Sequence, residues 1–181
     1  MNLTKPNYQA WLVEAADFPK NGAFKEKVEF LLRYAILAPS AHNTQPWAFL
    51  VRESGVKVYI DKKRRLSHSD PEQRQTYESL GACIENLVIA AEHFGFSAAV
   101  EYALANIEED SDKKLVANVN LAPSAGSRRQ HDDLFDAITK RHSAKLEYVS
   151  DKIPESLLSE LKTFWYAKDK IGRLKDLNDV L

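Results

Sequence analysis

The segment Ala38-Pro39-Ser40-Ala41-His42-Asn43-Thr44-Gln45-Pro46-Trp47 connects a stretch with helical spacing of apolar residues to a short apolar stretch typical of a strand. Between its two turn-forming prolines it carries hydroxyl, amide and imidazole side chains in close succession. On a loop held between rigid elements, such groups can contact the edge of a polar, planar ligand. Pro, Ser and Asn are also common in ordinary turns, so a plain connection between helix and strand stays open.

The rest of the sequence shows both helical and strand patterns. Apolar residues recur at helical spacing over about 8–16, 22–36, 72–94 and 132–140, and Pro154 begins a further helix. Short apolar or alternating stretches over about 47–51, 56–60, 97–104 and 115–121 indicate strands. Gly55 eases the turn between the first two strands, which we expect to form a hairpin.

The stretch 72–94 is apolar on most sides of the predicted helix. A helix with so little polar surface has to be buried, either in the centre of the domain or in an oligomer interface. We predict a symmetric contact between two copies of the chain that buries Leu80, Ile84, Leu87 and Ala91.

The composition limits the classes of partner. Across 181 residues, 25 Lys and Arg are balanced by 26 Asp and Glu, so no general attraction to nucleic acid or acidic membranes is expected. No stretch reaches the roughly 20 apolar residues of a membrane helix, and no N-terminal leader pattern is present. We therefore expect a cytoplasmic protein, and its hydrophobic share of 44% suits a globular core.

Several common chemistries have no pattern in the sequence. None of the five histidines lies at metal-ligand spacing from another His or from the single cysteine, Cys83, so we predict no metal. Cys83 cannot form an internal disulfide and is expected to pack as a small hydrophobic residue. The glycine motifs of Rossmann and P-loop nucleotide sites are absent. Ser40 near His42 lacks the flanking glycines and the third group of a hydrolase site.

The segment A-P-S-A-H-N-T-Q-P-W, followed by A-F-L-V, resembles the P-S-x-x-N-x-Q-P-W-x-F segment of the nitroreductase superfamily of flavin enzymes. It is most similar to the branch in which one long chain carries two related halves, and the match continues through 61–65, Asp70-Pro71, Arg74 and 79–95. The resemblance implies an α+β, nitroreductase-like (flavin reductase) fold with an antiparallel-rich sheet covered by helices. It also implies that FMN lies against this loop, which would bring six residues to the cofactor: Pro39, Ser40, His42, Asn43, Gln45 and Trp47.

A second segment, R-H-S-A-K over residues 141–145, resembles the R-[RH]-S-x-[RK] segment with which ordinary nitroreductases begin. By that resemblance, Arg141, His142, Ser143 and Lys145 hold the flavin phosphate and the ring edge. A phosphate is well matched by the planar donor fork of Arg and by a neighbouring hydroxyl, although basic clusters at helix ends are more commonly solvated surface.

The two segments stand in the reverse of the usual order. In homodimeric relatives each flavin takes its phosphate contacts from one chain and its P-S-x-x-N loop from the other, so this order would reproduce that interface within one chain. We predict a first half over 1–122, a linker over 123–130 and the start of a second half over 131–181. The fold would then be incomplete, because the apolar stripe of the last residues has no further chain to pack against.

The function predicted from this resemblance is an FMN-dependent oxidoreductase that passes electrons from NAD(P)H through the flavin to a small nitroaromatic or quinone-like acceptor. The flavin carries the chemistry, so no catalytic residue is assigned. We expect a homodimer, and we expect no nucleic-acid or membrane partners. Two alternatives stay open: a flavin-binding, sequestering or interaction protein of the same fold that does not turn over, and a fragment that binds no flavin.

Overall fold

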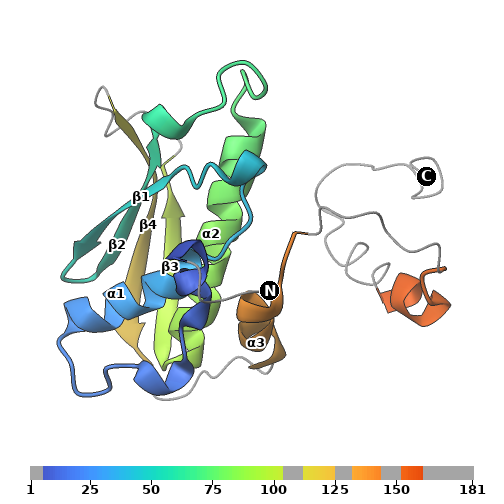
Figure 1. Ribbon diagram of the computed structural model, residues 1–181. Helices are drawn as coiled ribbons and strands as arrows, with labels where there is room; N and C mark the ends of the chain where they lie inside the picture. Colours follow the sequence, from blue (N-terminus) through green and yellow to red (C-terminus); the bar gives the residue numbers. More distant parts are fainter. Residues whose placement is uncertain (1–5, 104–111, 125–131, 144–151, 161–181) are drawn as a thin grey trace. The chain divides into compact units, whose positions relative to one another are not determined.

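The computed structural model of this protein describes residues 6–103, 112–124, 132–143 and 152–160 (Figure 1). The chain divides into two compact units, Met1–Ser143 and Ala144–Leu181. The first unit extends past the predicted linker at 123–130 and includes the helix that follows it. In the second unit, a short helix over 155–160 begins directly after Pro154, as the sequence indicates. The predicted division into two related halves stays a prediction.

The centre of the first unit is a four-stranded antiparallel sheet in the order β1-β2-β4-β3. The strands are β1 (Trp47–Arg52), β2 (Gly55–Asp61), β3 (Phe96–Tyr102) and β4 (Lys113–Pro123). The predicted hairpin of β1 and β2 is confirmed, and a Cβ at Gly55 would collide with the Val119 carbonyl oxygen on β4. Only glycine permits this close approach of two backbones. With the helices described next, the sheet confirms the predicted α+β class.

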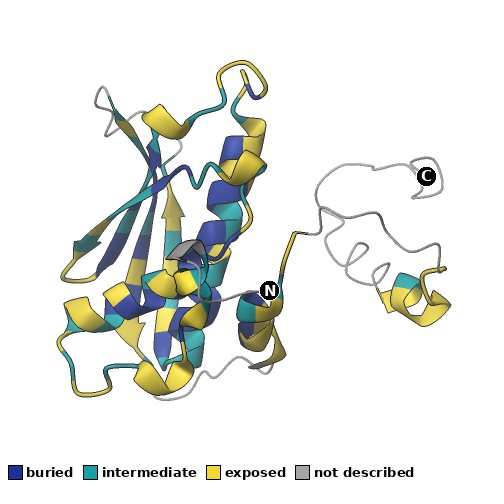
Figure 2. Ribbon diagram, viewed as in Figure 1, coloured by how far each residue is buried: buried dark blue, intermediate teal, exposed yellow. Residues whose placement is uncertain are grey.

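Two helices, α1 (Phe24–Ala35) and α2 (Arg74–His93), pack together over one face of this sheet (Figure 1). Figure 2 shows the buried positions that run along α2. The predicted contact between two copies through this helix is wrong, because Leu80, Ile84, Leu87 and Ala91 are between 0% and 2% exposed within a single chain. They face the core that α2 shares with α1 and the sheet, so this apolar face is covered internally.

A third helix, α3 (Asp132–Lys140), packs against α2 and the end of α1. Its buried residues, Phe135 and Ile138, are three positions apart and so lie on one face of the helix. The Phe135 ring stacks on His93, with centroids 3.7 Å apart, and its centroid lies 4.8 Å from that of Tyr34. Aromatic contacts therefore fix the position of α3, and with it the chain that leaves α3 at Arg141.

The N-terminal helix predicted over about 8–16 is replaced by two 3-10 helices, η1 (Pro6–Leu12) and η2 (Ala15–Asp17). Between them Val13 is buried, while Leu12 and Glu14 on either side are exposed. The helical stretch is thus broken at Val13, which packs in the core. The consequence for the site is that Trp11, on η1, faces the region where α3 ends.

Candidate functional site

The connection between α1 and β1, residues 39–47, has a strained backbone. It contains one turn of 3-10 helix, η3 (Ala41–Asn43), and φ is positive at His42 (50°), Asn43 (57°) and Gln45 (49°). Residues other than glycine pay roughly 1–2 kcal/mol each for a left-handed conformation. Such strain persists only where surrounding contacts impose it, and it is concentrated at functional sites. This backbone makes the 39–47 loop a candidate binding loop.

Hydrogen bonds from and to side chains help to hold the loop in this shape. The Gln45 amide donates to Ser40 Oγ (3.0 Å), and Arg64 Nη1 donates to the Gln45 carbonyl (3.3 Å). Thr44 Oγ1 donates to the Ala41 carbonyl (2.9 Å), and the Ala41 amide donates to Ser79 Oγ on α2 (3.3 Å). Both backbone groups of the most unusual residue, Gln45, are thus fixed by side chains. Ser40, which was predicted to contact a cofactor, also shapes the loop.

A hollow of about 250 Å³ lies between the loop and the first turns of α2. It is lined by the loop residues Pro39, Ser40 and Ala41 and by Gln75, Glu78 and Ser79 of α2. The Glu78 carboxylate on its wall accepts a hydrogen bond from Arg74 Nε at 3.1 Å. Ligand pockets are usually about 300–1,000 Å³, so this hollow can take a part of a cofactor and not the whole of one.

The first turn of α2 is fixed by Asp70. Its carboxylate accepts hydrogen bonds from the Gln75 amide (3.1 Å), the Thr76 amide (2.9 Å) and the Thr76 hydroxyl (2.8 Å). Burial alone would raise the pKa of this carboxyl, but the hydrogen bonds from Thr76 and Gln75 lower it below its ordinary value. Asp70 therefore acts as an ionised cap that positions the α2 wall of the hollow.

Arg141 is the part of the downstream segment that reaches this region. Its Nη2 donates to the Leu37 carbonyl at 3.0 Å, two residues before the 39–47 loop, and its Nη1 donates to Ser143 Oγ at 3.3 Å. Burial lowers the pKa of Arg141 below its ordinary value, though the guanidinium stays charged at neutral pH. The structure thus brings the predicted phosphate-holding arginine to the start of the predicted flavin loop.

The other predicted residues differ in their surroundings. His42 and Asn43 are exposed on the loop, whereas the side chain of Trp47 is buried in the core and anchors the end of the loop. His142 and Ser143 are exposed beside Arg141, and Lys145 lies outside the described residues. His142 Nδ1 donates to the Arg141 carbonyl at 2.8 Å, which places the proton of a neutral ring on that nitrogen.

One residue at this place was not predicted. The Trp11 ring lies 4.8 Å from the His142 ring, edge to face, and its centroid is 5.9 Å from the Arg141 guanidinium carbon. No local sequence pattern links positions so far apart along the chain, so only the folded chain reveals this contact.

Two absences apply to the part of the chain that the structure describes. In those ranges, no three His, Cys, Asp or Glu side chains are grouped closely enough to hold a metal ion. No helix there combines the length and the apolar character that crossing a membrane would require.

Comparison with known proteins gives several sequence relatives that are named as nitroreductases. The chain is 26% identical over 136 residues to Putative NAD(P)H nitroreductase acg of Mycobacterium tuberculosis, and 29% identical over 129 residues to Putative NAD(P)H nitroreductase Rv3131 of the same species. It is 24% identical over 143 residues to Probable NAD(P)H nitroreductase PigM of a Serratia species. The resemblance to the nitroreductase superfamily is confirmed. No protein-family profile matches the chain.

These nitroreductase matches cover most of this chain and a minor part of the relatives. They span 75%, 71% and 78% of the chain, but only 40%, 36% and 40% of the three relatives in the order given above. The chain thus spans about two fifths of the length of the relatives it matches.

Among solved structures, the chain is similar to Putative NADH Oxidase from Clostridium acetobutylicum, with a TM-score of 0.49 and 21% identity. That alignment covers 61% of this nitroreductase-like chain and 83% of the other. A nitroreductase family protein from Clostridium difficile gives a TM-score of 0.49 with 12% identity, over 78% of this chain and 88% of the other.

Proposed function

We propose that this chain is the FMN-binding part of an NAD(P)H-dependent oxidoreductase of the nitroreductase type, with a small nitroaromatic or quinone-like acceptor. One observation carries the proposal: Arg141 Nη2 donates to the Leu37 carbonyl at 3.0 Å, so the two segments that resemble flavin-binding segments meet within one unit. The names of the sequence relatives support the same class of reaction. A cytoplasmic location and a homodimer belong to the proposal, and such a dimer would use a surface other than the core face of α2.

The residues at this place fit the phosphate end of FMN. Arginine has five N–H donors in a planar fork, and the described contacts of Arg141 engage two of them. The remaining donors and the exposed hydroxyl of Ser143 suit a phosphate dianion, which is well matched by a planar donor fork. The hollow beside the 39–47 loop is too small for a whole flavin, so it would take one edge of the cofactor.

The protein residues have separate roles in this proposal. Arg141 and Ser143 would neutralise and orient the phosphate, and the exposed amide of Asn43 would offer polar contacts to the ring edge. Ser40 and Arg64 would act indirectly, because their hydrogen bonds hold Gln45 in its left-handed conformation. Bound FMN would supply the hydride chemistry between nicotinamide and acceptor, which is why the chain needs no catalytic acid or base of its own.

The test is a titration of the whole chain with FMN, followed by flavin fluorescence, for the wild type and for Arg141→Ala. Charged hydrogen bonds are worth about 1.5–3 kcal/mol, so we expect affinity to fall about 10- to 100-fold with little change in stability. Arg141→Lys is the matched control: it keeps the charge but loses the planar fork, and it should recover only part of the affinity. Equal affinity of wild type and Arg141→Ala would contradict the assigned role, and no binding at all would remove FMN from the proposal.

A second candidate is a protein that holds FMN without turning over. The small volume of the hollow favours it, since about 250 Å³ leaves little room for a substrate beside the flavin. Addition of NAD(P)H under anaerobic conditions separates the two candidates. An oxidoreductase loses its yellow colour, whereas a protein that only holds the flavin keeps it.

A further inference from the structure

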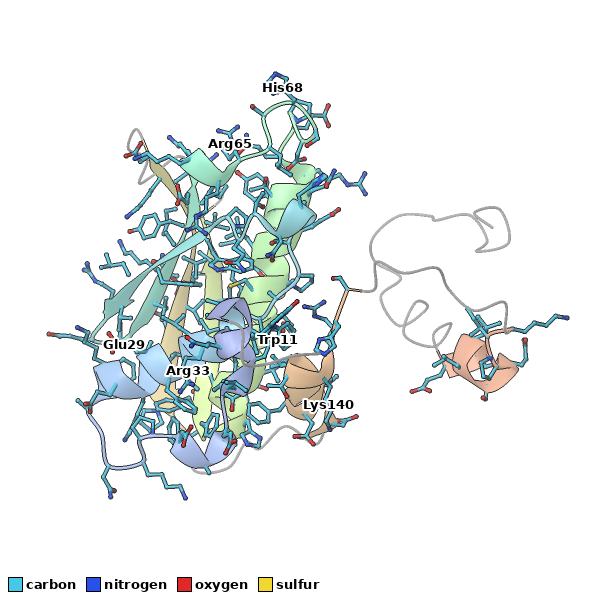
Figure 3. All side chains as sticks on the ribbon, in the orientation of Figure 1. Trp11, Glu29, Arg33, Arg65, His68 and Lys140 are labelled. Atoms are coloured by element: carbon cyan, nitrogen blue, oxygen red, sulfur yellow. The ribbon has the colours of Figure 1, made fainter. Side chains whose placement is uncertain are left out.

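We propose that Trp11 is a positioning residue for the phosphate anchor: its ring holds the Arg141 guanidinium and the His142 imidazole in the orientation that binds FMN. The inference rests on the proposed function and adds to it a residue outside both resembling segments. Figure 3 shows Trp11 beside α3, the helix from which Arg141 follows.

Two contacts carry the inference. The Arg141 guanidinium carbon lies 5.9 Å from the Trp11 ring centroid, within the range in which a cation is attracted to an aromatic ring. The imidazole of His142 meets the same ring edge to face, with centroids 4.8 Å apart and planes at 78°. One indole therefore contacts two consecutive residues of the predicted phosphate-binding segment.

The indole is itself held firmly. Trp11 is half-buried and packs against the hydrophobic core, and Val13, two residues later, is buried. Its position is thus supported by the core of the folded domain as well as by the segment it contacts. A side chain that is already ordered can restrict the rotamers of a flexible neighbour while losing little conformational entropy itself.

This restriction should raise the affinity of Arg141 for a phosphate. A free arginine side chain samples many rotamers, and fixing one of them on binding costs conformational entropy and so weakens affinity. In the folded chain the guanidinium is held at two other points, the Leu37 carbonyl and Ser143 Oγ. With Trp11 the restraints come from three directions, and the remaining donors are ordered before a phosphate arrives. Trp11 would then raise FMN affinity without touching the cofactor.

The competing explanation is that Trp11 only fills space against the core. Two substitutions of similar apolar character separate these explanations. Trp11→Phe keeps an aromatic face for Arg141 and His142, whereas Trp11→Leu keeps apolar packing and removes that face. Leu12→Ala is the control on the same helix, since Leu12 is 47% exposed.

The experiment measures FMN affinity and thermal stability of the whole chain for these variants, each made with Arg141 present and with Arg141→Ala. We expect Trp11→Leu to lower FMN affinity about three- to tenfold, Trp11→Phe to stay within about twofold of wild type, and Leu12→Ala to have no effect. In the Arg141→Ala background, Trp11→Leu should cause little further loss, because both changes remove the same anchor.

Three outcomes would overturn the inference. The first is an equal loss of affinity from Trp11→Leu with and without Arg141, which would mean that Trp11 acts through general packing. The second is an equal loss for Trp11→Leu and Trp11→Phe, and the third is no loss at all. In all three cases the wild type still binds FMN and the proposed function stands. A wild type that binds no FMN would instead overturn both.

Discussion

Replacement of Phe135 by alanine tests whether the docking of α3 is what brings Arg141 to the 39–47 loop. Phe135 is 6% exposed, and its ring contacts three others: His93 at 3.7 Å, Tyr34 at 4.8 Å and Phe94 at 5.5 Å between centroids. The helix that carries it has nine residues, too few to be stable in isolation. The formation of α3 and its position therefore both depend on the packing of Phe135 against these rings.

The size of the effect follows from the buried groups of α3. Burial of a Phe or Ile side chain contributes about 1.5–3 kcal/mol, so Phe135 and Ile138 together provide about 3–6 kcal/mol of docking free energy before the cost of ordering the helix. Loss of a buried Phe side chain costs about 3–5 kcal/mol, which is most of that sum. We therefore expect α3 to separate from the core while the sheet, α1 and α2 stay folded.

Hydrogen exchange measured by mass spectrometry and FMN titration give the two readouts. In Phe135→Ala the amides of 132–140 should exchange rapidly while those of β2 and β4 stay protected, and FMN affinity should approach that of Arg141→Ala. Leu134→Ala is the matched control. The Leu134 side chain, next to Phe135 in the sequence, is 44% exposed, so its loss should lower stability by less than about 0.5 kcal/mol. If Phe135→Ala bound FMN as tightly as wild type with α3 released, the argument that α3 positions Arg141 would be refuted.

Two substitutions and one labelling experiment test other features of the unit. Asp70→Ala should lower the free energy of unfolding at neutral pH. Because the pKa of Asp70 is lowered in the folded chain, the stabilisation by its carboxylate is complete above the ordinary pKa of 3.8 and is lost as pH falls through the folded pKa. The denaturation curves of wild type and variant should therefore converge in acid. Gln45→Gly should raise stability by up to about 1 kcal/mol in denaturant titrations, since φ is 49° there, and should weaken FMN binding. Burial raises the pKa of the Cys83 thiol, so a thiol reagent should label it only on unfolding, and rapid labelling of the native protein would contradict its placement.

Much of the architecture could be predicted because the local patterns agree with the fold. The stretch 115–121 indicates a strand, and its alternate residues Leu115, Ala117, Val119 and Leu121 are all buried on β4. The apolar stretch 72–94 was recognised as a buried helix, but a pattern of this kind says only that a face is covered and not by what. The covering elements turned out to be α1 and the sheet of the same chain.

The site could be predicted less completely. The sequence indicates the 39–47 loop and Arg141 as candidates, which stays a prediction, but it could not separate groups that face solvent from groups that hold the loop. Ser40 Oγ accepts the Gln45 amide, a local bond that serine forms readily and that composition does not reveal. Trp11 could not have been found, because its contacts with Arg141 and His142 join opposite ends of the first unit along the chain.

The place of α3 in the chain has a consequence for biosynthesis. All four described strands end by Pro123, and both helices that cover the sheet precede that point, so the ribosome delivers the sheet and its covering layer before it makes the helix that leads into Arg141. Chains begin to fold from the N-terminus during synthesis, so the sheet with α1 and α2 can begin to pack before α3 adds Phe135 and Ile138 to the core. Arg141 follows α3, so the residue that we propose as the phosphate anchor reaches the Leu37 carbonyl only after the 39–47 loop and the sheet have been made.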